Sequence, residues 1–339
     1  MKKYNVAVVG ASGAVGEEIF KILEEQNFPI QKILPLASSR SAGSEIEVFN
    51  QKHKIQETTK DIFAKEKIDI AFFSAGGAVS EEFAPYAASA GAVVIDNTSH
   101  FRMDKEVPLV VPEVNPQDVA LWKQKGIIAN PNCSTIQMVQ VLNPLHQKYK
   151  IKRVDVSTYQ AVSGAGKKGM EELVMQMQKF FAFELEDSIP SAFPHRIALN
   201  LIPQIDSFME NSYTKEEMKM MLETNKIMHS DFAVSATCVR VPVLRSHSES
   251  ISIVFENEVD ADEARKILEG SKNIIVLDDP KKLSYPMPSI ATDTDMTYVG
   301  RIRNDLYDKK ILHLWCVADQ IRVGAATNAI RIAKEWINL

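Results

Sequence analysis

The feature that most constrains this chain is a glycine-rich turn close to its N-terminus. A continuous apolar run at residues 6–9 leads directly into Gly10, Gly13 and Gly16, and an amphipathic helical pattern follows. A strand, a tight turn and a helix in this order are typical of a Rossmann-like dinucleotide-binding domain, in which the amides at the helix start meet a pyrophosphate. The spacing is GxxGxxG instead of GxGxxG, so a tight turn without a ligand is the alternative.

The remaining apolar runs predict two kinds of sheet. In the first part of the chain they are short and continuous, which indicates strands buried on both faces of a mostly parallel sheet, at residues 33–37, 68–73, 92–95, 109–111 and 127–129. After about residue 150 they are longer and partly alternating, which favours a mixed or antiparallel sheet, at residues 154–156, 239–244, 251–255, 274–277, 298–302 and 311–317. Helical patterns accompany them at residues 169–183, 215–229, 261–269 and 323–337.

The length of 339 residues suggests two domains. We therefore expect an α/β fold with a Rossmann-like dinucleotide-binding domain and a second, α+β domain with a mixed sheet. The predicted boundaries assign residues 1–132 with 320–339 to the first domain and residues 133–319 to the second.

Composition excludes several functions. The 39 basic and 44 acidic side chains leave a formal charge of −5, so binding to a nucleic-acid backbone is not expected. No apolar run approaches the roughly 20 residues that span a bilayer, and the start has no signal-peptide pattern, so no membrane association and a cytoplasmic location are expected. The cysteines form no CxxC pair, and neither a disulfide framework nor a metal site is predicted.

The segment after the second apolar run bears on cofactor choice. An NAD-specific site places an acidic residue there to bind the ribose 2′-hydroxyl, but this chain has Ser38, Ser39, Arg40 and Ser41. Hydroxyls and an arginine suit a 2′-phosphate, so the sequence predicts NADP. The alternative is that Arg40 lies in solvent and the serines only form a turn.

Cys133 is the strongest candidate for a nucleophile. It follows the apolar run 127–129 and begins a helical pattern, and a helix N-terminus favours a thiolate and lowers the pKa of the thiol. Cys238 and Cys316 lie within apolar strands and are predicted to be core residues. For a general acid or base, His247 lies in a polar break between two strands, while His100 beside Arg102 is a competitor.

The chain resembles the bacterial aspartate-semialdehyde dehydrogenase family across essentially its whole length. The motifs that carry the resemblance are residues 10–16, 99–103, 130–135, 159–166 and 240–248. The resemblance implies that the protein makes aspartate semialdehyde and phosphate from 4-aspartyl phosphate with NADPH, early in the biosynthesis of lysine, diaminopimelate, methionine, threonine and isoleucine. It also implies that the second domain is catalytic and forms a homodimer, with a homotetramer as the alternative.

The resemblance further implies a role for individual residues. Cys133 is similar to the nucleophile that forms a thioacyl enzyme, His247 to the acid or base, Gln160 to the residue that orients the intermediate, and Asn132 to a residue that shapes the pocket. The resemblance implies that Arg240 binds the α-carboxylate of the substrate and that Glu216, or the adjacent Glu217, binds the α-ammonium. It also implies that Arg102 and Lys219 bind the phosphate. The positions similar to cofactor-binding ones are Gly10, Ser12, Gly13, Ala14, Val15, Ser39, Arg40, Ser41, Ser163, Gly164 and Gln320.

Two points stay open in the sequence. Arg240 and His247 are an odd number of residues apart, so one straight strand would place them on opposite faces, and a bend near Pro242 has to be assumed. The second open point is the activity. An N-acetyl-glutamyl-phosphate reductase is the alternative enzyme, and it would use the same thioacyl chemistry without an acidic residue for an ammonium group. A dinucleotide-binding sensor or scaffold with an inert Cys133 is the non-enzymatic alternative.

Overall fold

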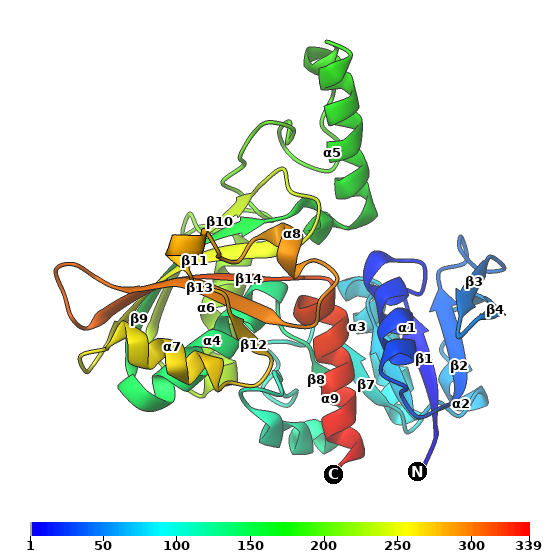
Figure 1. The fold of residues 1–339 in the computed structure, drawn as a ribbon. Coiled ribbons are helices and arrows are strands. Elements are labelled where there is room, and N and C mark those ends of the chain that lie inside the picture. The colour runs from blue at the N-terminus through cyan, green and yellow to red at the C-terminus, as the bar shows by residue number, and fades with distance from the viewer. Residues whose placement is uncertain (1) are drawn as a thin grey trace. The chain divides into compact units, whose positions relative to one another are not determined.

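The structure is a computed structural model that describes residues 2–339, apart from the side chain of Asp187. The chain divides into two compact units, which are described separately (Figure 1). Unit 1 comprises Met1–Asn132 and Ala325–Leu339, and unit 2 comprises Cys133–Gly324. The boundaries predicted for the functional domains stay a prediction, and Gln320 belongs to unit 2 by compactness.

Unit 1 is built on a six-stranded sheet with the order β5-β2-β1-β6-β7-β8. Every neighbouring pair is parallel, which confirms the predicted Rossmann-like sheet. The strands are β1 (Tyr4–Val9), β2 (Ile30–Ala37), β5 (Gln56–Glu57), β6 (Ile70–Phe73), β7 (Val93–Asp96) and β8 (Ile127–Ala129), and a separate hairpin consists of β3 (Glu45–Val48) and β4 (Gln51–Lys54).

The helices of unit 1 are α1 (Ala14–Glu25), α2 (Ile62–Lys65), α3 (Gly77–Ser89), a 3-10 helix (Pro116–Gln124) and α9 (Thr327–Ile337). α1 forms because Ile19, Ile22 and Leu23 recur at helical spacing and are fully buried in the core of the unit. The C-terminal α9 contacts α1 and β7, so the two ends of the chain share one core (Figure 1).

The prediction of a strand at 109–111 was wrong. Only Leu109 forms a single bridge, to Ala129.

Unit 2 contains a mixed six-stranded sheet with the order β10-β9-β11-β14-β13-β12. β10 runs parallel to β9, and β12 runs parallel to β13, while the other pairs are antiparallel, which confirms the predicted mixed sheet. The strands are β9 (Ile151–Gln160), β10 (Ala233–Arg240), β11 (His247–Phe255), β12 (Ile274–Val276), β13 (Thr297–Asn304) and β14 (Ile311–Ala318).

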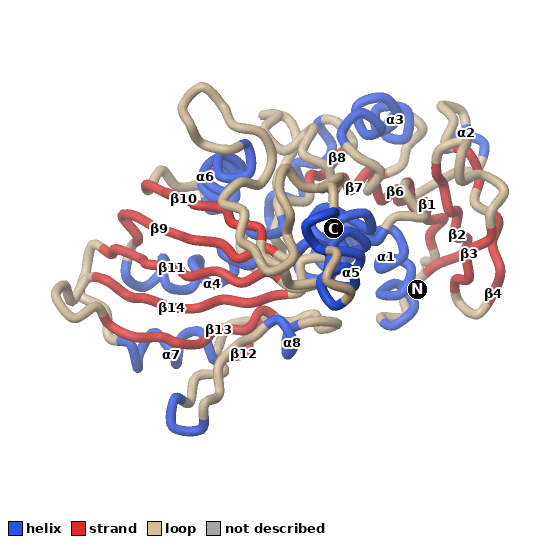
Figure 2. The backbone as a smooth tube through the Cα atoms, turned by 90° about the horizontal axis from the view of Figure 1, so that it is seen from above, coloured by secondary structure: helices blue, strands red, loops and turns tan. Residues whose placement is uncertain are grey.

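Helices cover one face of this sheet, and α5 projects away from it (Figures 1 and 2). α4, α6 and α7 enclose the apolar core between themselves and the strands. The α-helices are α4 (Cys133–Tyr149), α5 (Gly166–Phe181), α6 (Lys215–Met228), α7 (Ala261–Glu269) and α8 (Pro288–Ala291). The 3-10 turns are Val162–Ala165, Leu185–Asp187 and Pro280–Lys282, and a π-helical turn spans Arg322–Ala326.

The predicted strand at 239–244 was wrong in its second half, because β10 already ends at Arg240. Pro242 has no amide hydrogen for a strand ladder, which favours an end to the strand. The chain then turns through Ser246, whose φ of 75° lies in the left-handed region, and β11 begins at His247. The bend assumed near Pro242 is therefore a turn between two strands. It places Arg240 at the end of β10 and His247 at the start of β11.

Candidate active site

Cys133 is the first residue of α4 and is partly exposed, whereas the thiols of Cys238 and Cys316 are buried in the core of unit 2. Its surroundings depend on Gly324. A Cβ atom at position 324 would lie 2.6 Å from the Cβ of Cys133 and 3.0 Å from its Cα. Because real Cβ atoms do not approach so closely, the backbone at Gly324 leaves no room for a side chain and lies directly against the Cα and Cβ of Cys133.

The end of β9 brings the other candidates together. Gln160, its last residue, is paired with Arg240 on the neighbouring β10. On the opposite side, Tyr159 is paired with Ser248 of β11, so His247 lies beside the same strand end. The odd separation of Arg240 and His247 in sequence therefore does not matter, since the two residues flank β9 from two different strands.

The peptide of Ala161 links these two side chains. Arg240 donates from Nη1 to the carbonyl oxygen of Ala161 at 2.6 Å, and the amide of Ala161 donates to Nδ1 of His247 at 3.1 Å. A Cβ at Gly164 would lie 2.7 Å from Nη1 of Arg240 and 3.4 Å from Nε2 of His247. The backbone of the turn after β9 thus lies against both functional groups.

His247 is fully buried, and its ring is held in one tautomer. Burial and, secondly, the Arg240 guanidinium lower the pKa of His247 well below its ordinary value, so the ring is neutral. Since Nδ1 accepts a hydrogen bond from Ala161, the ring proton is on Nε2. Within residues 2–339 this Nε2 has no hydrogen-bond partner. The neutral ring therefore offers one free N–H donor.

A second polar cluster lies next to Gln160. Its Nε2 donates to Oε1 of Glu216 at 3.1 Å, and Lys219 is 3.2 Å from the other Glu216 oxygen and 3.0 Å from Asp206. Burial alone would lower the pKa of Lys219, but the two carboxylates, Glu216 first, raise it. Asp206 was missed by sequence reasoning, because nothing in its local pattern distinguishes it from a loop residue.

Glu216 and Glu217 are adjacent but do different work. Glu217 accepts from the amide of Thr214 at 2.7 Å through one oxygen and from the amide of Cys238 at 3.1 Å through the other. It completes a capping box at the start of α6 and ties this helix to β10. Both Glu217 oxygens are thus used within the fold, and Glu216 is the carboxylate that lies beside Gln160.

Three of the predicted cofactor positions also belong to unit 2. Gln320 is hydrogen-bonded to the Ser163 hydroxyl, and its Oε1 accepts from the amide of Ser246 at 2.7 Å. The neighbouring Asp319 forms an ion pair with Arg245, in which Oδ2 of Asp319 lies 2.8 Å from Nε of Arg245. The chain segment that leads into His247 is thereby attached to the segment after β14, and Ser163, Gly164 and Gln320 lie around the histidine.

The remaining cofactor positions lie in unit 1, in the loops after β1 and β2. Gly10 has a φ of 94°, and a Cβ there would lie 2.9 Å from the backbone of Ser74, so only glycine fits this turn. The hydroxyls of Ser12 and Ser41 lie 3.5 Å apart, which joins the glycine turn to the loop after β2. Ser39 and Arg40 are exposed in that loop, and α1 begins directly after Gly13. These features fit a dinucleotide phosphate site.

The other predicted residues are also part of unit 1. Arg102 is buried and donates to the carbonyl oxygens of Asn130 at 2.9 Å and Asn97 at 2.8 Å. Asn132 is buried immediately before Cys133. His100, the competitor for the acid or base, faces Glu81 at 3.9 Å.

Residues 2–339 contain neither a metal-binding cluster nor a helix that could span a membrane. No cluster of three or more His, Cys, Asp or Glu side chains is arranged to hold a metal ion. None of the helices in this part of the chain combines the length and the apolar character that crossing a membrane requires.

Fold and site together define a two-domain dehydrogenase of the semialdehyde dehydrogenase class. Residues 5–122 match the semialdehyde dehydrogenase NAD binding domain, and residues 142–323 match the semialdehyde dehydrogenase dimerisation domain. The first match covers the parallel sheet of unit 1 except for Tyr4 and β8, and the second covers the whole mixed sheet of unit 2.

Comparison with individual proteins narrows the class. The chain is 64% identical to an aspartate-semialdehyde dehydrogenase of Campylobacter jejuni, over 100% of this chain and 98% of that protein. The structure of aspartate semialdehyde dehydrogenase II from Vibrio cholerae complexed with ASA superposes with a TM-score of 0.96 at 44% identity, covering 100% and 99% of the two chains. The structure of aspartate semialdehyde dehydrogenase with NADP from Candida albicans superposes with a TM-score of 0.76 at 27% identity, covering 98% of each chain. The chain belongs to the aspartate-semialdehyde dehydrogenase family.

Proposed function

We propose that this protein catalyses the NADPH-dependent reductive dephosphorylation of L-4-aspartyl phosphate to L-aspartate 4-semialdehyde and phosphate. The observation that carries the proposal is the convergence of Arg240, Gln160 and a neutral His247 at the end of β9, in the same unit as a partly exposed Cys133. Membership of the aspartate-semialdehyde dehydrogenase family supports the substrate.

NADP is the proposed cofactor. In unit 1 the glycine turn at Gly10, Gly13 and the start of α1 (Ala14, Val15) would hold the pyrophosphate, and Ser12, Ser39, Arg40 and Ser41 would meet the 2′-phosphate. In unit 2 the corresponding residues are Ser163, Gly164 and Gln320. When bound, NADPH supplies a hydride to the acyl carbon. A relative with bound NADP supports this choice over NAD.

The first step is an acyl transfer to Cys133. The thiolate attacks the carbonyl carbon of the acyl phosphate, a C–S bond forms, and the C–O bond to phosphate breaks, with the electron pair leaving on the phosphate. The position of Cys133 at the first turn of α4 favours the thiolate, because the N-terminal end of the helix dipole stabilises a negative charge there. Asn132, the residue before it, shapes the pocket.

The second step uses the free N–H of His247. After the hydride reaches the thioester carbon, the negative charge is on the former carbonyl oxygen, and Nε2–H of His247 donates a hydrogen bond that stabilises this oxyanion until the C=O bond forms again. The C–S bond then breaks, the aldehyde forms, and the electron pair returns to the Cys133 sulfur. Gln160 orients the intermediate from the end of β9.

Substrate charges are met by residues on three elements. Arg240 is buried and presents a planar guanidinium suited to two hydrogen bonds to the α-carboxylate. Glu216 is proposed for the α-ammonium, because both oxygens of Glu217 are engaged elsewhere. Lys219 and, from unit 1, Arg102 are proposed for the phosphate.

The reaction is proposed to stand early in the biosynthesis of lysine, diaminopimelate, methionine, threonine and isoleucine. The test is the reverse reaction: NADP reduction in the presence of aspartate semialdehyde, with and without phosphate. We expect reduction only with all three components. Equal rates without phosphate, or a preference for N-acetyl-glutamate semialdehyde over aspartate semialdehyde, would overturn the proposal.

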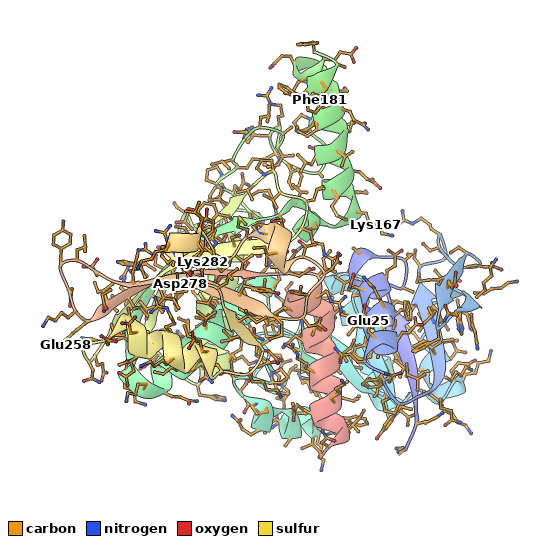
Figure 3. The ribbon with its side chains drawn as sticks, in the orientation of Figure 1. Glu25, Lys167, Phe181, Glu258, Asp278 and Lys282 are labelled. Carbon is orange, nitrogen blue, oxygen red and sulfur yellow. The ribbon has the colours of Figure 1, made fainter. Side chains whose placement is uncertain are left out.

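A homodimer is proposed as the working form. Unit 2 carries large apolar side chains that are mostly exposed. They include Phe181 at the far end of α5 (73%; Figure 3). Tyr307, between β13 and β14 in the chain, is 96% exposed. Such exposure marks protein interfaces, and this unit matches the dimerisation domain of the family. Sedimentation velocity should give twice the chain mass of 37.9 kDa, and a mass of one chain at assay concentration would contradict the dimer.

A further inference from the structure

A buried polar layer lies below the reactive residues of unit 2, and the proposed chemistry does not use it. Along β11 the chain passes from His247 through Glu249 to the core residue Ile251, and along α4 it passes from Cys133 through Gln137 to the core residue Val141. Glu249 and Gln137 are both 0% exposed. On the strands beside β11, Glu249 lies opposite Thr158 of β9 and Cys316 of β14.

Gln137 connects the helix of the nucleophile to the strand of the histidine. It lies four residues after Cys133 on α4, and its Nε2 donates to the carbonyl oxygen of His247 at 3.5 Å. The carboxyl group of Glu249 faces the same amide. A group that holds Gln137 in place therefore acts on both Cys133 and His247.

Within residues 2–339 the Gln137 amide would stabilise a negative charge on Glu249, but this effect on the pKa is smaller than that of burial, and no cation adds to it. Within the described chain neither of its carboxyl oxygens receives a hydrogen bond of ordinary geometry, and Oε1 of Gln137 also lacks a donor. The titratable groups that face Glu249 from β10 and β14 are the thiols of Cys238 and Cys316, and no cation of residues 2–339 stabilises it. Burial raises the pKa of Glu249 well above its ordinary value. A proton on Glu249 would turn two unpaired acceptors into a donor and an acceptor.

We propose that Glu249 is a neutral carboxylic acid in the folded protein and a positioning residue for the active site. Its O–H donates to Oε1 of Gln137, and Gln137 in turn donates to the His247 carbonyl oxygen. This pair of hydrogen bonds fixes the first turns of α4 against the start of β11. The kinetic part of the inference rests on the proposed function, whereas the protonation state does not.

Two substitutions of Glu249 test whether a neutral hydrogen-bond donor at this position is what the active site needs. Glu249→Gln keeps the shape, the neutrality and a donor, so kcat should stay within about threefold of the parent, as expected for exchange of one neutral hydrogen bond. Glu249→Leu removes the donor, and misplacement of the reactive groups should lower kcat about tenfold or more with little change in KM. The pH midpoint for alkylation of Cys133 by iodoacetamide should be unchanged in Glu249→Gln and shifted in Glu249→Leu.

Thr297→Val is the matched control. Thr297 on β13 donates to Oε1 of Gln140 at 2.5 Å, so it is another buried tie between α4 and the sheet, about one helical turn further from Cys133. Its loss should lower the unfolding temperature while leaving the alkylation midpoint and kcat as in the parent. A shift of the alkylation midpoint in this control equal to that in Glu249→Leu would show that Glu249 is merely structural.

The protonation state is measured directly and without any substrate. The infrared difference spectrum between the parent and Glu249→Gln should contain the carbonyl stretch of a protonated acid and no carboxylate bands. Urea unfolding supplies a second readout. Because the folded-state pKa is raised above the ordinary value of 4.5, the parent should lose stability relative to Glu249→Gln as the pH rises above that value.

Carboxylate bands in the folded parent, or unfolding curves with no such pH trend, would overturn the neutral acid. Parent-like kcat and alkylation in a folded Glu249→Leu would overturn the positioning role. If the protein lacked the proposed activity, the infrared, unfolding and alkylation results would still decide the inference, so its failure is distinct from that of the proposed function.

Discussion

The two units assemble their functional residues in different ways. In unit 1 the proposed pyrophosphate site is local, because Gly10, Gly13 and the start of α1 follow one another in the chain. In unit 2 the proposed catalytic residues come from four separate segments, at Cys133, Gln160, Arg240 and His247. Gln160, Arg240 and His247 meet because β9 lies between β10 and β11, while Cys133 comes from the start of α4.

This difference affects how each site responds to substitution. A local site depends mainly on the conformation of one turn and on the side chains in it. A site assembled from neighbouring strands depends on register and close packing, so residues without chemistry, such as Gly324 and Ala161, become as important as the reactive ones. The following substitutions test this contrast, from the largest expected effect to the smallest.

Cys133→Ser should leave the fold intact and lower kcat by about 10³-fold or more, because a serine hydroxyl has no comparable anionic form near neutral pH. The measurement combines the reductive dephosphorylation rate with iodoacetamide labelling of the parent. Cys238 and Cys316 serve as internal controls, because they are buried and should label slowly. Activity within tenfold of the parent, or faster labelling at either buried thiol, would remove Cys133 from the mechanism.

Gly324→Ala should lower kcat about 10²-fold, since the new Cβ would displace Cys133 and such misplacement carries losses of this order. Gly270→Ala is the matched control, because its Cβ would meet nothing closer than 3.6 Å, an ordinary contact. The two variants are compared by steady-state kinetics and thermal unfolding. An active Gly324→Ala with normal Cys133 alkylation would show that this close approach does not limit catalysis.

Arg240→Lys should weaken substrate binding by about 10- to 150-fold, the equivalent of one charge-assisted hydrogen bond of roughly 1.5–3 kcal/mol, and leave NADP binding unchanged. Calorimetric titration of each ligand separates the two effects. Arg153→Lys is the control, since Arg153 forms an exposed ion pair with Asp155 on β9. Unchanged substrate affinity in Arg240→Lys would reduce Arg240 to a structural strand residue.

Arg40→Asp tests the part of the proposed cofactor site of unit 1 that lies in the loop after β2. Replacing the cation with an acid should reduce or invert the preference for NADP over NAD, by about 1–3 kcal/mol if one charged hydrogen bond dominates. The ratio of kcat/KM values for the two cofactors is measured at fixed salt. Lys52→Asp on the exposed β4 makes the same charge change as a control. An unchanged NADP preference in Arg40→Asp would show that the exposed loop does not select the cofactor.

The sequence predicted the glycine turn and the buried parallel strands of unit 1, and the reason is physical. A buried parallel strand is a continuous apolar run, and a glycine turn is a local signal, so both are readable without knowledge of their neighbours. The error at 109–111 shows the limit of this approach. The apolar run there is buried but makes only one bridge, because burial does not require strand pairing. In unit 2 the end of β10 at Arg240 likewise depended on pairing that the pattern at 239–244 does not contain.

The sequence contains the residue types that the chemistry requires: a cysteine at a helix start, a histidine in a polar break, a glycine turn before a helix, and an arginine where NAD-binding proteins have an acid. How these groups act on one another depends on the packing of the folded chain. The strand order placed Arg240 and His247 on either side of Gln160, one amide set the tautomer of His247, and burial without a cation set the charge of Glu249. Side-chain type is encoded residue by residue, whereas distance, burial and charge state depend on which distant segments pack together.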